Sequence, residues 1–272
     1  MNKYLRVTNK IYIYQKDKKS LISRIFILVL FFLPICLLKK NLRNLNQKNK
    51  ITLIVKGDGE YKSFLSSLVT IPNEITINGI IQDNPNTICL LTEPENTIIL
   101  SWDTPLTTCE NMFYALDIIL LIDFSEFDSS KVTNMNSLFY GCINLKTIKL
   151  KNLDTSSVKD MSNMFYGCIS LTSLDLSNFD TSLVTTMRNM FNNCTSLISI
   201  NLSSFNISSL VLFNMIFYNC KSLVFINLNS FVEPSFVDTN NVFSSELNNL
   251  VYCIDENKAP TISNIIKNIK RK

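Results

Sequence analysis

Four cysteines recur at a constant spacing in the second half of this 272-residue chain, and they are its first candidates for chemistry. Cys142, Cys168, Cys194 and Cys220 lie 26 residues apart. A cysteine can act as a nucleophile or as a metal ligand, and the stretch NMFYGCISLTSLDLSNFDTS at 163–182 places Met, Tyr and Asp side chains beside one of them. The chain contains no His. This excludes Ser–His and Cys–His catalysis and His-ligated zinc, and no CxxC pair offers a thiolate zinc site.

The glycines do not form a phosphate-binding loop. Of the five glycines in the chain, two belong to GDG at 57–59. This triplet lacks the Lys-Ser/Thr and the strand–loop–helix context of a P-loop, so we interpret it as a turn. We therefore predict that the protein is not an enzyme and that it binds no cofactor and no metal.

The spacing of the cysteines is shared by the residues around them. Each Cys follows a Phe by three residues, and Met, Leu, Ile and Phe recur in phase over four clear units, with degraded units on both sides. One unit cannot bury its own apolar face, so neighbouring units must bury it together. The Cys and Met columns are predicted to be core, and Asp128, Asp154 and Asp180 to be cap or turn residues. Disulfides between units and a calcium ladder are the alternatives.

Each unit divides into two halves. In residues 181–194, TSLVTTMRNMFNNC, capping residues precede apolar residues at every third or fourth position, which is typical of one face of a helix. The following LISINL alternates as a short strand does. The predicted fold class is α/β: a leucine-rich-repeat-like solenoid of 26-residue helix/loop–strand units with a parallel strand ladder. A small N-terminal β region and an N-terminal hydrophobic helix are expected before it.

The repeat resembles that of the BspA-like leucine-rich repeat surface proteins, specifically their 26-residue repeat class, which is also found in mycoplasma lipoproteins and protist surface proteins. LDLSNFDTSLVTTMRNMFNNCTSLIS at 174–199 carries the resemblance, which covers residues 124–230 well and 109–254 loosely. The resemblance implies a secreted or surface-anchored, non-catalytic protein linked with adhesion or host contact.

Charge and hydropathy divide the chain into regions. Residues 1–50 hold 12 Lys and Arg against one acid, whereas residues 51–254 hold 9 against 19 acids. An acidic body binds polyanions poorly, so nucleic acid is not an expected partner. The predicted regions are a basic segment at 1–20, a signal peptide or signal-anchor helix at 21–38, a polar linker at 39–50, a β-rich cap region at 51–108, the repeat array at 109–254 and a basic tail at 255–272.

The segment from Leu21 to Leu38 sets the predicted location. Within it, Ile25–Leu38 is an uncharged run of 14 residues, which is short for a full membrane span but long enough for a secretory core. We expect a cell-surface protein, membrane-anchored or secreted, that contacts the membrane through this helix. Lipidation of Cys36 and a buried helix of a soluble domain are the alternatives.

The exposed strand positions are the predicted binding residues. Repeat arrays bind through an extended face, which in leucine-rich repeats lies between the leucines of each strand. The expected function is adhesion or the binding of a protein or glycan on another cell or on the matrix, and a membrane-tethered intracellular scaffold is the alternative. The predicted residues are Lys146, Thr147, Lys149, Thr172, Ser173, Asp175, Ile198, Ser199, Asn201, Val224, Phe225 and Asn227.

Two kinds of covalent modification are also candidates. Asn193, Asn201 and Asn206 each begin an N-glycosylation sequon. Cys89 and Cys109 lie near the start of the array and are candidates for a disulfide outside the cell.

Overall fold

The computed structural model describes residues 49–67, 69–83, 85–244, 247 and 249–269. The chain divides into two units, of which the second, Lys48–Lys272, holds the described residues, and the fold below is that of the second unit. The predicted basic segment, the predicted helix from Leu21 to Leu38 and most of the linker lie outside the described residues. In the described part, no helix is both long and apolar enough to cross a membrane.

Six strands form the N-terminal part of this unit. They are β1 (Asn49–Lys56), β2 (Glu60–Ser63), β3 (Glu74–Ile77), β4 (Ile80–Ile81), β5 (Ile88–Leu91) and β6 (Glu95–Trp102). β1 pairs antiparallel with β6, β6 with β3, and β3 with β4, while β2 and β5 form a separate antiparallel pair. Ile51, Leu53 and Val55 of β1 are fully buried, because alternate side chains of a strand point to the same face.

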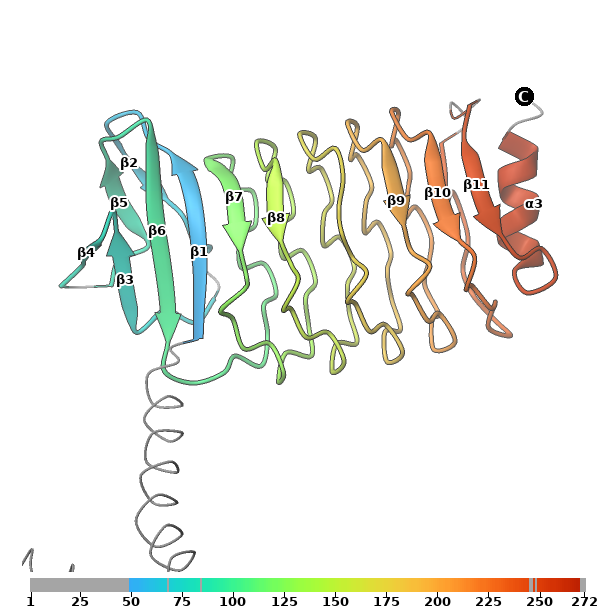
Figure 1. Cartoon of the computed structure of the whole chain (residues 1–272), viewed down its shortest axis with the longest axis horizontal. Helices are drawn as coiled ribbons and strands as arrows, with labels where there is room; N and C mark the ends of the chain where they lie inside the picture. Colours follow the sequence, from blue (N-terminus) through green and yellow to red (C-terminus); the bar gives the residue numbers. More distant parts are fainter. Residues whose placement is uncertain (1–48, 68, 84, 245–246, 248, 270–272) are drawn as a thin grey trace, which may run out of the picture. The chain divides into compact units, whose positions relative to one another are not determined.

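Residues from 108 onward wind into a stack of 26-residue coils (Figure 1). Parallel backbone bridges join the first residues of successive coils, so coils 1 to 6 begin at Thr108, Asn134, Asp160, Thr186, Leu212 and Asp238. The coils carry the strands β7 (Ile119–Asp123), β8 (Thr147–Lys149), β9 (Ser199–Asn201), β10 (Phe225–Leu228) and β11 (Val251–Ile254). β7 pairs parallel with β8, and β9, β10 and β11 pair parallel in turn. β1 pairs antiparallel with β7, which joins the N-terminal strands to coil 1.

The predicted α/β class with helical half-units is wrong. Residues 187–194, expected in a helix, form consecutive turns, and the described part of the chain is mostly β and turn structure with α3 as its one helix. The backbone N–H groups of Met187, Asn189, Phe191 and Asn193 donate to carbonyls of coil 5 at 2.9–3.1 Å, and not within their own coil. The leucine-rich-repeat-like model with a helix in each unit is thereby replaced by coils without helices.

The apolar period of three to four residues has a different cause in this structure. Between those that reach coil 5, the N–H groups of Met190 and Asn192 close four-residue turns to the carbonyls of Met187 and Asn189, at 3.1 and 3.0 Å. Asn189 and Asn193 adopt φ of 57° and 60°, the left-handed region, which an α-helix of L-residues cannot continue through. A succession of such turns therefore returns an apolar side chain to the core about as often as a helix does.

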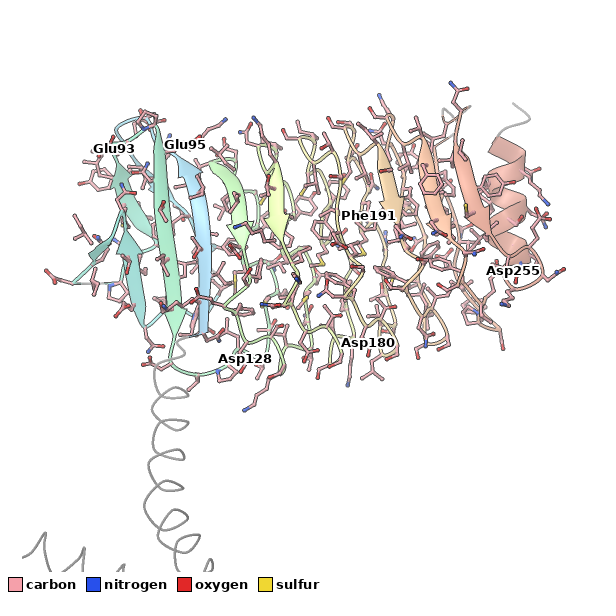
Figure 2. The ribbon with its side chains drawn as sticks, viewed as in Figure 1. Glu93, Glu95, Asp128, Asp180, Phe191 and Asp255 are labelled. Atoms are coloured by element: carbon pink, nitrogen blue, oxygen red, sulfur yellow. The ribbon has the colours of Figure 1, made fainter. Side chains whose placement is uncertain are left out.

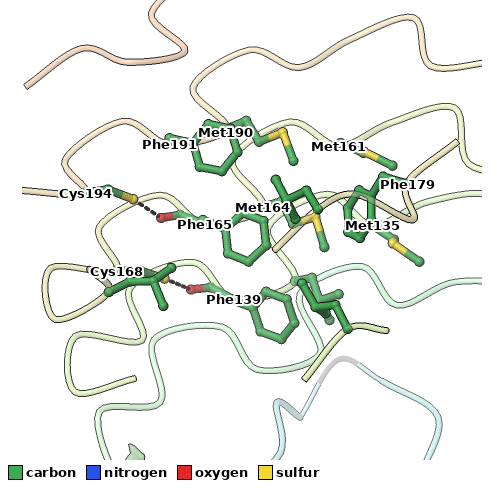
Figure 3. Close-up of a cluster of buried hydrophobic side chains, with 14 of the residues drawn as sticks. Met135, Phe139, Met161, Met164, Phe165, Cys168, Phe179, Met190, Phe191 and Cys194 are labelled. Carbon is green, nitrogen blue, oxygen red and sulfur yellow. Dashed lines mark hydrogen bonds between the residues drawn. The ribbon is translucent and has the colours of Figure 1, made fainter. Parts of the chain in front are cut away.

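Aromatic stacking runs through the core of the stack. Phe113, Phe139, Phe165, Phe191, Phe217 and Phe243 stack in succession, with ring centroids 5.3–6.0 Å apart, and Figure 3 shows the middle of this column. At the N-terminal end, Trp102 is almost fully buried. Its indole N–H donates to the Thr70 carbonyl at 3.1 Å, and its ring meets Phe127 edge-on at 6.1 Å.

The C-terminal end of the stack is closed by α3 (Pro260–Ile269), which lies beyond β11 (Figure 1). Ala259, Ile262 and Ile266 are fully buried in the common core. The described part of the predicted basic tail at 255–272 therefore contains a helix whose apolar side packs against the coils.

Candidate interaction face

The cysteine column is part of the core. Cys142, Cys168, Cys194 and Cys220 are fully buried. Each Sγ–H donates to the carbonyl of the Phe 29 residues earlier, at 3.0–3.1 Å, and Figure 3 shows two of these bonds. Burial raises the pKa of Cys142 and Cys220 to about 12 and the pKa of Cys168 and Cys194 well above its ordinary value. These thiols stay protonated and out of reach, so they offer neither a nucleophile nor a metal ligand.

The Asp column forms turns along one edge of the stack, where Figure 2 marks Asp128 and Asp180. Oδ1 of Asp128, Asp154 and Asp180 accepts the N–H of the Ser two residues later at 2.9–3.1 Å. The hydrogen bonds from Ser182 hold the pKa of Asp180 below its ordinary value. In the part of the chain that the structure describes, no group of three or more acidic or Cys side chains is arranged to hold a metal ion.

The predicted binding residues lie in coils 2 to 5, and we call this set the strand face. Three triplets belong to β8, β9 and β10 or directly precede them. Thr172, Ser173 and Asp175 lie in coil 3, whose corresponding segment forms no strand, so the sheet containing β8 and the sheet containing β9 are separate. Ser199, Phe225 and Asn227 are half-buried, and the other members of the strand face are exposed.

The polar residues that end these strand segments also have a structural role. Oδ1 of Asp175, Asn201 and Asn227 accepts the N–H of the residue two positions later, at 3.0–3.1 Å. In coil 2 the same position holds Lys149, whose Nζ pairs with Asp123 of coil 1 at 2.8 Å. The sequence pattern indicated an exposed column but missed that its Asp and Asn members cap turns.

An apolar stripe crosses the C-terminal half of this surface. Ile198, Val224 and Val251 are 49%, 45% and 57% exposed. They are neighbours, because the Val224 N–H donates to the Ile198 carbonyl at 2.9 Å and the Val251 N–H to the Val224 carbonyl at 2.8 Å. Ile198 and Val224 are among the predicted binding residues. Val251 is not, because it lies in the degraded last unit, where the leucine pattern fades.

A tyrosine stack on another edge of the coils was also missed. Tyr114, Tyr140 and Tyr166 stack with ring centroids 4.6 and 4.5 Å apart. Their spacing of 26 residues was the available signal. The stack stops at coil 4, where Asn192 takes the same position and is buried.

The modification candidates divide by environment. Asn201 and Asn206 are exposed, but the half-buried Asn193 already uses its amide, donating from Nδ2 to the Tyr166 hydroxyl at 3.0 Å. The candidate disulfide is not formed. Cys89 is a partly exposed free thiol in β5, whereas Cys109 is a fully buried free thiol at the start of coil 1.

Comparison with known proteins gives one match. Residues 107–231 match the model of the family described as DUF285, Mycoplasma protein of unknown function. The match covers coils 1 to 4 and most of coil 5, which is somewhat less than half of the chain. No curated protein and no solved structure matches the chain. Residues 107–231 are therefore similar to a family described from Mycoplasma, and the finer resemblance to BspA-like proteins stays a prediction.

Proposed function

We propose that this protein is a non-enzymatic binding protein of the cell surface that holds a protein partner on its strand face. The apolar stripe carries the proposal. Contiguous exposed apolar side chains beside polar residues, here Asn201 and Asn227, are typical of interaction sites. Aliphatic side chains such as Val224 offer no hydrogen-bonding groups to sugar hydroxyls, and this favours a protein over a glycan.

The remaining parts of the proposal have separate support. Protonated, buried thiols and acids that cap their own turns support a non-catalytic role. The resemblance to BspA-like surface proteins and the targeting pattern from Leu21 to Leu38 support a location at the cell surface. Adhesion is the role implied by the resemblance alone.

Photo-crosslinking tests the binding surface. A benzophenone side chain placed at Val224 of the full chain should capture a discrete partner from native membranes, and Val251→Asp should abolish the capture. Val211 is the matched control, because it is 44% exposed but lies at the end of coil 4, outside the strand face. Equal capture from positions 224 and 211, or capture unaffected by Val251→Asp, would show that the stripe is not the binding site.

Protease treatment of intact native cells tests the location. The coils should be cleaved on intact cells, and an intracellular marker protein should stay intact. Protection of the coils until the cells are lysed would rule out a surface location.

A second candidate function is an intracellular, membrane-tethered scaffold. All seven cysteines in the described residues are free thiols, and thiols stay reduced in the cytosol. Protection from protease combined with stripe-dependent crosslinking would select this function.

A further inference from the structure

Helix α3 takes the place that the closing turn of a further coil would occupy. In coils 2 and 3, the hydroxyls of Thr155 and Thr181 accept the N–H of the residue 25 positions later, at 2.9 and 2.8 Å, and this fastens each coil to the next. The equivalent residue of coil 5 is Glu233. Its carboxylate accepts the N–H groups of Thr261 at 3.1 Å and Ile262 at 2.7 Å, at the start of α3. Glu233 therefore fastens α3 as the threonines fasten a following coil.

The contact of α3 with the stack is that of an amphipathic helix in its binding site. Ala259, Ile262 and Ile266 follow the i, i+3, i+7 spacing and are fully buried, whereas Asn264 and Asn268 on the other side are exposed. Apolar anchors at this spacing define helix-in-groove recognition. The Glu233 carboxylate adds a favourable charge at the positive end of the helix dipole.

The link between β11 and α3 is held mainly by local polar contacts. The Asp255 carbonyl accepts the N–H groups of Lys258 and Ala259 at 3.1 and 2.9 Å, and its carboxylate pairs with Lys258 Nζ at 3.3 Å. Lys267 pairs with Glu256 at 2.6 Å. Exposed pairs of this kind contribute about 0–1 kcal/mol each. The Glu233 N–H of coil 5 also donates to the Lys258 carbonyl at 2.9 Å, so Lys258 and the buried Ala259 belong with α3 and move with it. The stretch from Asp255 to Asn257 can therefore extend with the loss of local polar contacts only.

We propose that the surface under α3 also accepts α3 from a second copy of the chain, so that the helix exchanges between two chains and joins them as a dimer. In the exchanged pair, the helix of each chain makes the contacts of Ala259, Ile262 and Ile266 and the bonds to Glu233 on the other chain. The balance between monomer and dimer is then set by chain concentration and by the turn at Asp255. This inference is independent of the function proposed for the strand face.

Shortening the link tests the exchange. Deletion of Asn257 and Lys258 from the full chain prevents α3 from folding back onto its own coils, and the mass measured by light scattering after size exclusion should become that of a dimer. The same deletion combined with Ile262→Asp and Ile266→Asp should restore a monomer. A shortened chain that is monomeric, or one that stays dimeric with both aspartates, would overturn the proposal.

Binding in trans provides the second test. A labelled synthetic peptide of residues 256–272 should bind the full chain that carries Ile262→Asp and Ile266→Asp, because its own helix no longer occupies the site. The same peptide with the two aspartates is the matched control and should not bind, and Glu233→Ala in the chain should weaken binding by several-fold. Absence of binding to a chain that keeps its β-type circular dichroism would refute the exchange.

The chain with Ile262→Asp and Ile266→Asp could fail to fold. In that case, hydrogen exchange measured on the unmodified chain tests whether α3 can leave the coils. The amides of α3 should exchange faster than those of β10, because the helix can leave while the coils stay intact. Equal, slow exchange of both elements would contradict a releasable helix.

Discussion

A single carbonyl in each coil shows why Cys recurs at this position. The Phe139 carbonyl accepts the N–H of Cys142 in its own coil at 3.2 Å and the Sγ–H of Cys168 in the next coil at 3.1 Å. The second lone pair of a buried carbonyl is thus satisfied by a side chain small enough for the core. Ala would fill less of the space and donate nothing, and Ser would place a more strongly hydrated group in the same site.

Cys168→Ala should lower the free energy of unfolding by about 1–3 kcal/mol, the range for a core truncation that also removes a hydrogen bond. Urea unfolding followed by circular dichroism measures the change. Cys253→Ala is the matched control, since Cys253 is exposed and its loss should cost less than about 0.5 kcal/mol. Equal effects of the two substitutions would contradict the buried role of Cys168.

The thiol column also predicts an alkaline limit to stability. The pKa of Cys142 is about 12 in the folded chain against an ordinary value of 9.0. Between these values the unfolded chain loses a proton that the folded chain keeps, so stability is fully present below pH 9 and falls as the pH rises toward 12. Each such thiol contributes at most about 1.4 kcal/mol per pH unit. Urea midpoints measured from pH 8 to pH 11 should fall as the pH rises. Cys142→Ala should make this fall with pH less steep. If the substitution leaves the pH dependence unchanged, this thiol ionises freely in the folded chain.

At the level of elements, the repeat and its core columns were accessible from sequence, but the path of the backbone between them was not. The period of Met, Phe and Cys identifies the buried side chains in a helix and in a series of turns alike. The signal for turns lay in Asn189, Asn193 and Gly167, which occupy positions of positive φ. Asn and Gly tolerate that region, so their recurrence argues against a helix.

The exposed positions of the strand face were predictable in outline for a similar reason. Alternation along Leu197, Ile200 and Leu202 separates buried from exposed positions, which placed Ile198 and Val224 at the surface. The side chains of Asp175 and Asn201 accept the N–H of the residue two positions later. Such a local bond leaves no pattern in the sequence, so the sequence does not show whether the side chain bonds its own backbone or is free to contact a partner.

Gly167 offers a test of the turn conformation. It has φ of 70°, and a Cβ there would make only ordinary contacts, the nearest at 3.7 Å. Gly167→Asn should be close to neutral, because Asn193 holds the equivalent position in coil 4 with φ of 60°. Gly167→Val should cost roughly 1–3 kcal/mol, since a β-branched residue is strained at positive φ. Thermal melts of the two variants measure the difference, and melts that coincide would speak against the left-handed turn.

For the molecule as a whole, stability is expected to depend on neighbouring coils. Each coil bonds to the next through its backbone, β1 covers the first strand by pairing with β7, and α3 closes the last coil. Stability of such a stack is approximately a sum of coil and interface contributions. A change in the number of coils should therefore be tolerated better than a change in their phase.

Deletion of residues 160–185, which is coil 3, should leave a folded chain with a lower free energy of unfolding, because coil 2 then meets coil 4 in phase. Deletion of residues 160–172 removes half as much chain but displaces every later side chain from its column, so it should abolish cooperative unfolding. Circular dichroism during urea titration compares the two. A half-coil deletion as stable as the whole-coil deletion would mean that phase does not govern the stack.

The position of Trp102 has an optical consequence. It is the one tryptophan of the chain, and it lies where β6 meets Phe127 of coil 1. Its fluorescence therefore reports on a single boundary, while circular dichroism averages over all the coils. Recorded together during unfolding, the two signals can time the detachment of the N-terminal strands separately from the unwinding of the coils, without an added label.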